Sequence, residues 1–404
     1  MKVLYFDYWL KGYKNFIQID AHFKEKGINT KLFHIGSWRE TTKILTNVEG
    51  LDCYDIKFYN TNLVSKVIEY ETPDIIVLLN ISFLIDRVII DTCKRKNIKV
   101  IYLAHGKLSN IGILNEYISS SNKKIWYTIY NKFRKEIFFT IYNYFYNLIL
   151  NKKFFFLISQ LFKLIKSPGK FQSFSTFCEE LNIDKYLVYY QSDKEMMIKK
   201  LFFPEKKIFV IGNPELYKFK ETVIINKDIF INQLQINTLK YILYLEDGLV
   251  YNKIWKLNDW LLFLSDLYSY CFQENITLII KLHPKTEKQI LNEFIKNKNI
   301  KIFTNICMKN LVFYSDFCIS HYSSTIIYPL ILNKPVLSPR WGISNKLTLN
   351  FPENVIRYCY SINDFFEKAK TSDLKTNFDD SYLNSTIGDI SQYSKENLAN
   401  NILN

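Results

Sequence analysis

The sequence predicts an α/β protein made of two doubly wound domains that face a cleft. Three observations support this class. Short apolar runs alternate with longer amphipathic stretches along most of the 404 residues. Most of these runs are continuously apolar, which is typical of strands covered on both faces of a parallel sheet. The runs also form two series, separated by a polar stretch at Glu215–Thr238. Each series therefore predicts one Rossmann-like domain.

The first series predicts six strands, at Val3–Phe6, Lys31–His34, Ile75–Leu79, Val100–Leu103, Leu187–Tyr190 and Ile208–Ile211. The second predicts five, at Tyr241–Leu245, Thr277–Leu282, Ile300–Phe303, Phe317–Ser320 and Pro335–Leu337. Helices are expected between them, for example at Asn15–Lys26, Ile85–Lys96 and Asp259–Phe272. We expect domains at residues 1–225 and 226–404, with Ser391–Asn404 forming a helix that crosses back to the first domain. Ligands of such sheets bind beyond the carboxyl ends of the strands, so functional residues should directly follow the apolar runs.

Composition excludes several classes of protein. Hydrophobic residues make up 48% and charged residues 23%, which is enough apolar material for sizeable cores. The seven cysteines are an odd number with no CxxC pair, which argues against a disulfide framework and a zinc ribbon. The start, with Asp7 inside MKVLYFDYW, does not resemble a secretory signal, and no window reaches about 18 uncharged apolar residues. These features predict a cytoplasmic protein without a spanning helix.

The net charge of +14 is concentrated in one segment. Residues 123–170 carry ten Lys or Arg, one acid and fourteen aromatic residues. A basic, aromatic helical insertion suits the anionic inner face of the cytoplasmic membrane, where rings enter the headgroup region. The alternative is an insertion packed on the first domain with a solvated lysine face. Single-stranded nucleic acid also uses such residues, but no RNA-binding signature accompanies them, so no nucleic-acid partner is expected.

Histidines gather at predicted strand ends. His105, His283 and His321 directly follow long apolar runs, and His34 ends a shorter one. His283 precedes Pro284, which favours an extended backbone and aims the ring out of the sheet edge. With Lys281 nearby, this imidazole could contact a phosphate or protonate a leaving group. The alternative is a histidine that caps a strand end.

Three hydroxyl residues, Ser323, Ser324 and Thr325, follow the strand that ends before His321. At the start of a helix, free N–H groups, hydroxyls and the positive dipole end make an anion site. Simple N-capping would explain one of these hydroxyls but not three. Pro329, about one turn further on, is expected to shorten or kink the helix.

Two further strand ends carry polar residues. Glu246-Asp247-Gly248 would place a carboxylate in the cleft, where it could accept a proton from an attacking hydroxyl. His105-Gly106-Lys107 could contact an acceptor or a phosphate, with the glycine allowing close backbone approach. Plain strand-to-loop turns explain either motif about as well.

The sequence lacks the motifs by which several enzyme classes are usually recognised. The sequence has no GxGxxG, GxxxxGK[ST], HExxH or GxSxG motif. Hydride transfer on a dinucleotide fingerprint, P-loop hydrolysis, zincin proteolysis and serine-esterase chemistry are therefore not indicated.

In order, the motifs Glu246-Asp247-Gly248, His283-Pro284 and Ser323-Ser324 resemble those of bacterial GT-B sialyltransferases and polysialyltransferases. The likeness covers about residues 240–340. It implies an inverting, metal-independent glycosyltransferase that moves a CMP-activated nonulosonic acid to a cell-surface glycan or glycolipid. No cofactor is implied.

The same resemblance implies roles for individual residues. Asp247, or else Glu246, would deprotonate the acceptor hydroxyl. His283 would bind the CMP phosphate and assist its departure, with Ser323 and Ser324 on the same phosphate. Fixed donors of this kind stabilise the negative charge that grows on the leaving group.

A second likeness is to the CDP-glycerol glycerophosphotransferases of teichoic acid synthesis, through Ile319–Ser324, Leu332–Val336, His105-Gly106 and the His-Pro element. Those enzymes usually have aspartates where this chain has His321 and Tyr328. The chain also resembles capsule Kdo transferases, which use CMP-Kdo. A different class also stays open, a non-catalytic protein that binds a membrane surface on a GT-B scaffold.

Overall fold

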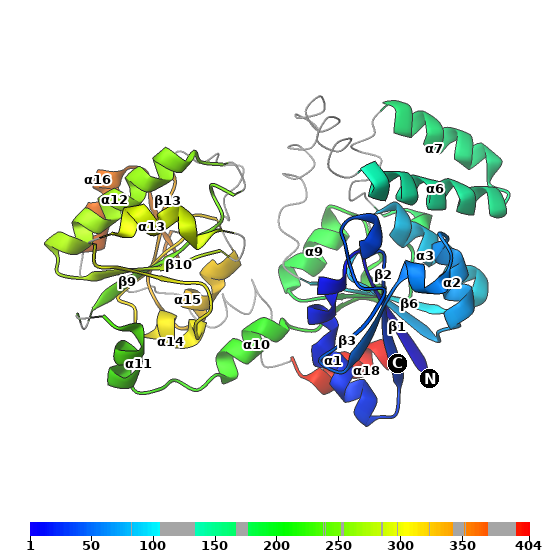
Figure 1. Ribbon diagram of the computed structural model, residues 1–404, viewed down its shortest axis with the longest axis horizontal. Coiled ribbons are helices and arrows are strands. Elements are labelled where there is room, and N and C mark those ends of the chain that lie inside the picture. The colour runs from blue at the N-terminus through cyan, green and yellow to red at the C-terminus, as the bar shows by residue number, and fades with distance from the viewer. Residues whose placement is uncertain are drawn as a thin grey trace. The chain divides into compact units, whose positions relative to one another are not determined.

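The computed structural model describes residues 1–404 except 82, 106–133, 167–176, 237, 239, 252–253, 284–285, 297, 323, 342–350, 352 and 371–392. The chain forms two compact units (Figure 1). Unit 1 comprises Met1–Asn213 and Ser385–Asn404, and unit 2 comprises Pro214–Asn384. The division lies before residue 225, because the N–H of Ile225 donates to Asn310 Oδ1 at 3.2 Å and thereby joins this stretch to unit 2.

Unit 1 is built on an eight-stranded sheet with the order β3-β4-β2-β1-β5-β6-β7-β8. β3 is antiparallel to β4, and every other neighbouring pair is parallel. The order reverses between β1 and β5, as in a Rossmann sheet. The strands are β1 (Lys2–Asp7), β2 (Asn29–His34), β3 (Leu45–Val48), β4 (Leu51–Asp55), β5 (Ile75–Leu78), β6 (Lys99–Leu103), β7 (Lys185–Val188) and β8 (Ile208–Val210).

The helices of unit 1 cover the sheet and extend beyond it (Figure 1). They are α1 (Tyr13–Glu25), α2 (Val64–Glu71), α3 (Leu84–Lys96), α6 (Arg134–Leu150), α7 (Phe154–Lys166), α9 (Gln191–Lys199) and α18 (Lys395–Leu403). α18 packs on α1, and Lys99 Nζ donates to the carbonyl of Leu403 at 3.3 Å. The predicted return of the C-terminal helix to the first domain is thereby confirmed.

Unit 2 has a six-stranded parallel sheet with the order β11-β10-β9-β12-β13-β14. Numbered within the unit, this is the 3-2-1-4-5-6 order of a Rossmann sheet, with the reversal between β9 and β12. The strands are β9 (Tyr241–Leu245), β10 (Thr277–Lys281), β11 (Ile300–Phe303), β12 (Cys318–Ile319), β13 (Val336–Pro339) and β14 (Arg357–Cys359). The helices are α10 (Pro214–Glu221), α11 (Lys227–Leu234), α12 (Leu257–Gln273), α13 (Asn292–Ile295), α14 (Met308–Phe313), α15 (Ile327–Ile331) and α16 (Ile362–Lys370).

All eleven predicted strands are present, with bounds that differ by a few residues. The sequence missed β3, β4 and β14. Only one face of β4 is deeply buried, so it reads Leu-Asp-Cys-Tyr-Asp rather than as an apolar run. β3 is its antiparallel edge partner. In the described part of the chain, no helix is long and apolar enough to cross a membrane.

Candidate functional site

Polar residues gather where the unit 2 sheet reverses its order. β9 is the central strand here, with β10 on one side and β12 on the other. Glu246-Asp247-Gly248 follows β9, His283 comes soon after β10, and Ser320–Ser324 follows β12. The carboxyl edge at such a reversal is the usual ligand position of an open α/β sheet. Three motifs that are far apart in sequence thus meet at one edge.

Glu246 joins the end of β9 to the loop that follows β10. Its carboxylate is buried. Oε2 accepts hydrogen bonds from the N–H of His283 at 3.0 Å and from Thr286 Oγ1 at 2.8 Å. Oε1 accepts from the N–H of Gly248 at 2.6 Å. Glu246 therefore positions the backbone of His283.

Asp247 makes the equivalent connection to the loop after β12. It too is buried. Oδ2 accepts from the N–H of His321 at 2.5 Å and of Tyr322 at 3.2 Å, and Ser320 Oγ donates to Oδ1 at 3.0 Å. Tyr322 also donates its hydroxyl to the Asp247 carbonyl at 3.1 Å. The carboxylate thus orients the turn that leads into Ser323 and Ser324.

The two carboxylates therefore diverge from one dipeptide toward the two neighbouring strands. Gly248, which follows them, has a φ of +71°, a conformation that a residue with a side chain adopts only with strain. A carboxylate that already accepts three or more hydrogen bonds from the protein is poorly placed to receive a further proton from a substrate. The geometry favours a positioning role for both Glu246 and Asp247.

His283 is half-buried, and its ring lies against that of Tyr251, with the centroids 6.5 Å apart. Lys281, at the end of β10, is also half-buried, and burial lowers the pKa of its ammonium group while the Glu246 charge opposes this. Lys281 Nζ donates to the carbonyl of Leu282 at 2.9 Å. Lys281 and His283 thus both stand at the carboxyl end of β10. The predicted contact residue Pro284 lies outside the described residues.

Of the three predicted hydroxyl residues, Ser323 and the side chain of Ser324 lie outside the description, and Thr325 is half-buried. Residues Ser324–Ile326 form a 3₁₀ turn, and α15 continues for only five residues. Pro329 lies within α15, in line with the expected shortening.

His321, the third strand-end histidine, turns inward. Its side chain is fully buried, and its ring contacts Tyr244, Trp255 and Phe263 with centroids 5.0–5.7 Å apart. Its Nδ1 lies 3.5 Å from Asp247 Oδ2. His321 therefore belongs to the core that supports the loop.

In unit 1, His105 lies two residues after the end of β6, at the carboxyl edge of the sheet. Its Nδ1 lies 3.0 Å from the carbonyl oxygen of Leu79, which can only accept a hydrogen bond. Nδ1 therefore carries the proton in the neutral ring, and Nε2 keeps its lone pair. His105 is exposed, and partial desolvation by its surroundings lowers its pKa. Gly106 and Lys107 lie outside the described residues.

The sequence analysis missed a second pair of carboxylates in unit 1. Asp7 ends β1 beside the reversal with β5, and Asp86 lies in the first turn of α3. Burial raises the pKa of Asp7 to about 6 and that of Asp86 to about 7, with the Asp7 charge adding to the shift of Asp86. A Cβ at Gly12 would lie 1.9 Å from Asp7 Oδ2, so only glycine fits there. The sequence signal that could have revealed this pair is Asp7, an acidic residue at the end of the first apolar run.

No group of three or more His, Cys, Asp or Glu side chains that could hold a metal ion occurs among the described residues.

Comparisons with known proteins agree with this architecture. Residues 172–344 match the model of the family "CDP-Glycerol:Poly(glycerophosphate) glycerophosphotransferase". No curated protein matches the chain. Among solved structures, UDP-GlcNAc 2-epimerase from Methanocaldococcus jannaschii, in complex with UDP-GlcNAc and UDP, is 14% identical, with a TM-score of 0.54 and 99% of each chain covered.

Two other solved structures are similar at the same level. S. aureus MnaA with UDP is 11% identical with a TM-score of 0.54, over 99% of this chain and 95% of that one. UDP-GlcNAc 2-epimerase from Neisseria meningitidis, bound to UDP-GlcNAc, is 14% identical with a TM-score of 0.51, over 100% of both chains.

The chain thus has a glycosyltransferase-like GT-B fold of two Rossmann-like units, as the sequence predicted. Its middle part, residues 172–344, is similar to a family of transferases that the sequence motifs also indicated.

Proposed function

We propose that this protein is a transferase that takes a group from a cytidine-nucleotide donor and releases CMP. The observation that carries the proposal is the convergence of three motif loops at the reversal of the unit 2 sheet, with Glu246 and Asp247 holding the loops on either side. The family match includes all three motifs.

The donor chemistry follows from the groups around this edge. CMP gains negative charge as its bond to the transferred group breaks. His283 would donate to the departing phosphate, and Lys281 would supply positive charge beside it. Ser323, Ser324 and Thr325 would add hydroxyl or backbone donors to the same phosphate. These donors can stabilise the leaving group in place of a metal ion, so we propose a metal-independent reaction.

The family match favours CDP-glycerol as the donor. In that reaction the acceptor oxygen attacks the β-phosphorus, glycerol phosphate is transferred and CMP departs. The ordered set Glu246-Asp247-Gly248, His283-Pro284 and Ser323-Ser324 supports a second candidate, inverting transfer of a CMP-activated nonulosonic acid or Kdo. CMP is released in either case. The acceptor would be a hydroxyl of a cell-surface polymer or glycolipid.

For the acceptor side we propose His105 as the proton acceptor. Its fixed tautomer leaves Nε2 free of a proton, and its lowered pKa keeps the ring neutral near pH 7. Glu246 and Asp247, for which the sequence motif suggested this role, would instead act by positioning the loops.

The first experiment is a thermal-shift titration with CMP, CDP, UDP and GDP. We expect the cytidine nucleotides to raise the melting temperature most, because ligands that bind the native state stabilise it. A preference for UDP or GDP would refute the cytidine assignment.

The second experiment measures CMP release from CDP-glycerol, CMP-sialic acid and CMP-Kdo, with product masses identifying the transferred group. His283→Ala should lower turnover by about a hundredfold or more, as expected for loss of a group that stabilises the leaving phosphate. His22→Ala, on α1, is the matched control and should retain activity. No release from any donor would favour a non-catalytic scaffold.

A further inference from the structure

The outermost helix of unit 1 presents apolar side chains to the solvent. In Figure 1, α6 lies beside α3, and α7 packs on the far side of α6. Phe155 is 93% exposed, Phe162 69% and Ile158 51%. Since these positions are three, four or seven residues apart, they lie on one helical face, which we call the α7 face.

The opposite side of α7 carries the half-buried Leu157 together with Gln160. Among the α7 side chains that the structure describes, Gln160 is the one that is buried, at 3% exposure, although glutamine is usually solvated. A helix adapted to water would bury the phenylalanines and expose the glutamine. The orientation of α7 therefore leaves its large apolar side chains on the outer face, which is favourable where that face meets an apolar medium.

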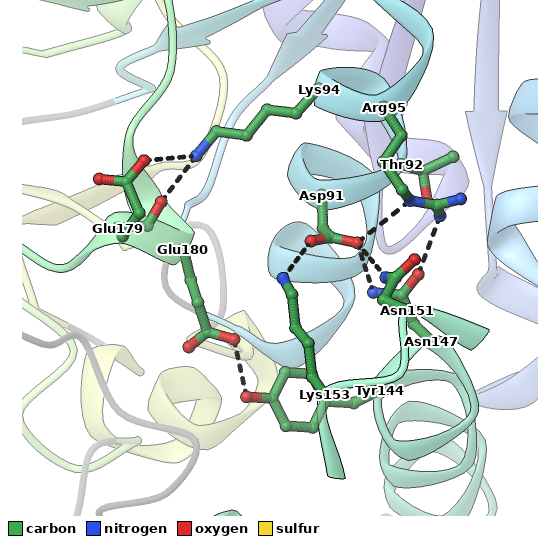
Figure 2. A network of polar contacts seen from close by, with 10 residues as sticks. All are labelled: Asp91, Thr92, Lys94, Arg95, Tyr144, Asn147, Asn151, Lys153, Glu179 and Glu180. Atoms are coloured by element: carbon green, nitrogen blue, oxygen red, sulfur yellow. Dashed lines mark hydrogen bonds and ion pairs between the residues drawn. The ribbon is translucent and has the colours of Figure 1, made fainter. Parts of the chain in front are cut away.

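A polar network holds the hairpin in this orientation (Figure 2). Asp91 on α3 accepts hydrogen bonds from Asn147 at 3.0 Å and Asn151 at 2.5 Å, and it pairs with Lys153 at 2.7 Å. Although burial alone would raise it, these partners hold the pKa of Asp91 below its usual value. Tyr144 on α6 donates to Glu180 at 2.8 Å. These polar contacts dock the hairpin together with buried apolar side chains of α6, whereas the α7 face stays exposed.

The charge around the α7 face is basic. α7 contains no acidic residue, Lys152 precedes it, and Lys163 is exposed one residue after Phe162. A second copy of this chain would bring the same lysines into apposition on a protein of net charge +14, which is unfavourable. An anionic lipid surface offers the complementary charge together with an apolar interior.

We propose that the α7 face is a docking surface for an anionic lipid bilayer. The 13 residues of α7 span about 20 Å, too short to cross a bilayer but enough to lie flat in the headgroup region. Phe155, Ile158 and Phe162 would enter the acyl boundary, and the lysines would contact lipid phosphates. This proposal is independent of the donor assignment.

Vesicle co-sedimentation tests it with the full-length protein. We expect binding to phosphatidylcholine vesicles containing about one third phosphatidylglycerol, and weaker binding to phosphatidylcholine alone. The double variant Phe155→Ser/Phe162→Ser should bind at least about tenfold more weakly, because two aromatic rings no longer enter the bilayer. Phe272→Ser, which removes a 74% exposed ring from α12, is the matched control and should bind like the wild type.

A second measurement guards against a folding defect in the double variant. In Phe155→Trp, brominated lipids should quench the new indole if position 155 enters the bilayer. Equal binding by the wild type and the double variant, or no quenching, would overturn the proposal. So would a concentration-dependent dimer in sedimentation velocity that the double variant abolishes, because the face would then join two copies of the chain.

Discussion

Replacing Asp247 by asparagine separates the positioning role from a proton-accepting role. The carboxylate accepts from Ser320 Oγ and from the backbone N–H groups of His321 and Tyr322. An asparagine keeps one acceptor oxygen and turns an NH₂ group toward donors that already point inward. At least one or two bonds to a charged acceptor are lost.

Each such bond contributes about 1.5–3 kcal/mol when the charged acceptor is buried. We therefore expect Asp247→Asn to lower the free energy of unfolding of unit 2 by roughly 2–5 kcal/mol. Urea denaturation, followed by fluorescence and circular dichroism, measures this as a lower midpoint at an unchanged slope. Glu353→Gln is the matched control, because it makes the same kind of change at an exposed carboxylate in unit 2.

The result that would refute the reasoning is an Asp247→Asn protein with the wild-type midpoint and lost turnover. Asp247 would then act on the substrate and contribute nothing to the loop. A destabilised variant that keeps part of its turnover when saturated with CMP-releasing donor is the outcome that the geometry predicts.

Three further predictions concern catalysis and pH. His105→Gln should abolish turnover while CMP binding persists. In the wild type, the acidic limb of the kcat/KM profile should have its midpoint below pH 6.5, because desolvation lowers the pKa of His105. A midpoint above pH 6.5 would exclude His105 as the base. Turnover should survive EDTA, and rescue of a chelated sample by Mg²⁺ would contradict metal independence. The wild type should lose unfolding free energy as pH rises from about 4 to about 7, because folded Asp86 holds its proton up to about pH 7 while the unfolded chain releases it near 4. Asp86→Asn should reduce the total loss of unfolding free energy between about pH 4 and about pH 7 by on the order of 4 kcal/mol, measured by urea titrations at each pH.

The sequence was informative about strands because burial on both faces leaves a direct trace. A strand that is covered on both faces of a parallel sheet is apolar throughout, so Tyr241–Leu245 can be recognised, bounds included, without any partner. Edge elements such as β3 leave no such trace, since half of their residues face water.

The motif residues were found for the same reason, as polar residues directly after apolar runs. The sequence did not show in which direction these side chains point. Glu246 and Asp247 are adjacent in sequence, but they accept hydrogen bonds from different loops, because β9 lies between β10 and β12. Ser320 and Thr286, which bind these carboxylates, gave no signal of their own in the sequence.

The sequence by itself thus determined two Rossmann-like sheets and the places where polar groups emerge from them, because periodicity and burial are local properties of the chain. Only the tertiary structure decided that His321 turns into an aromatic core, that His105 keeps Nε2 free of a proton, and that α7 points its phenylalanines outward. These outcomes depend on strand order and on neighbours from distant segments, such as Leu79 and Asp91, which no local pattern encodes.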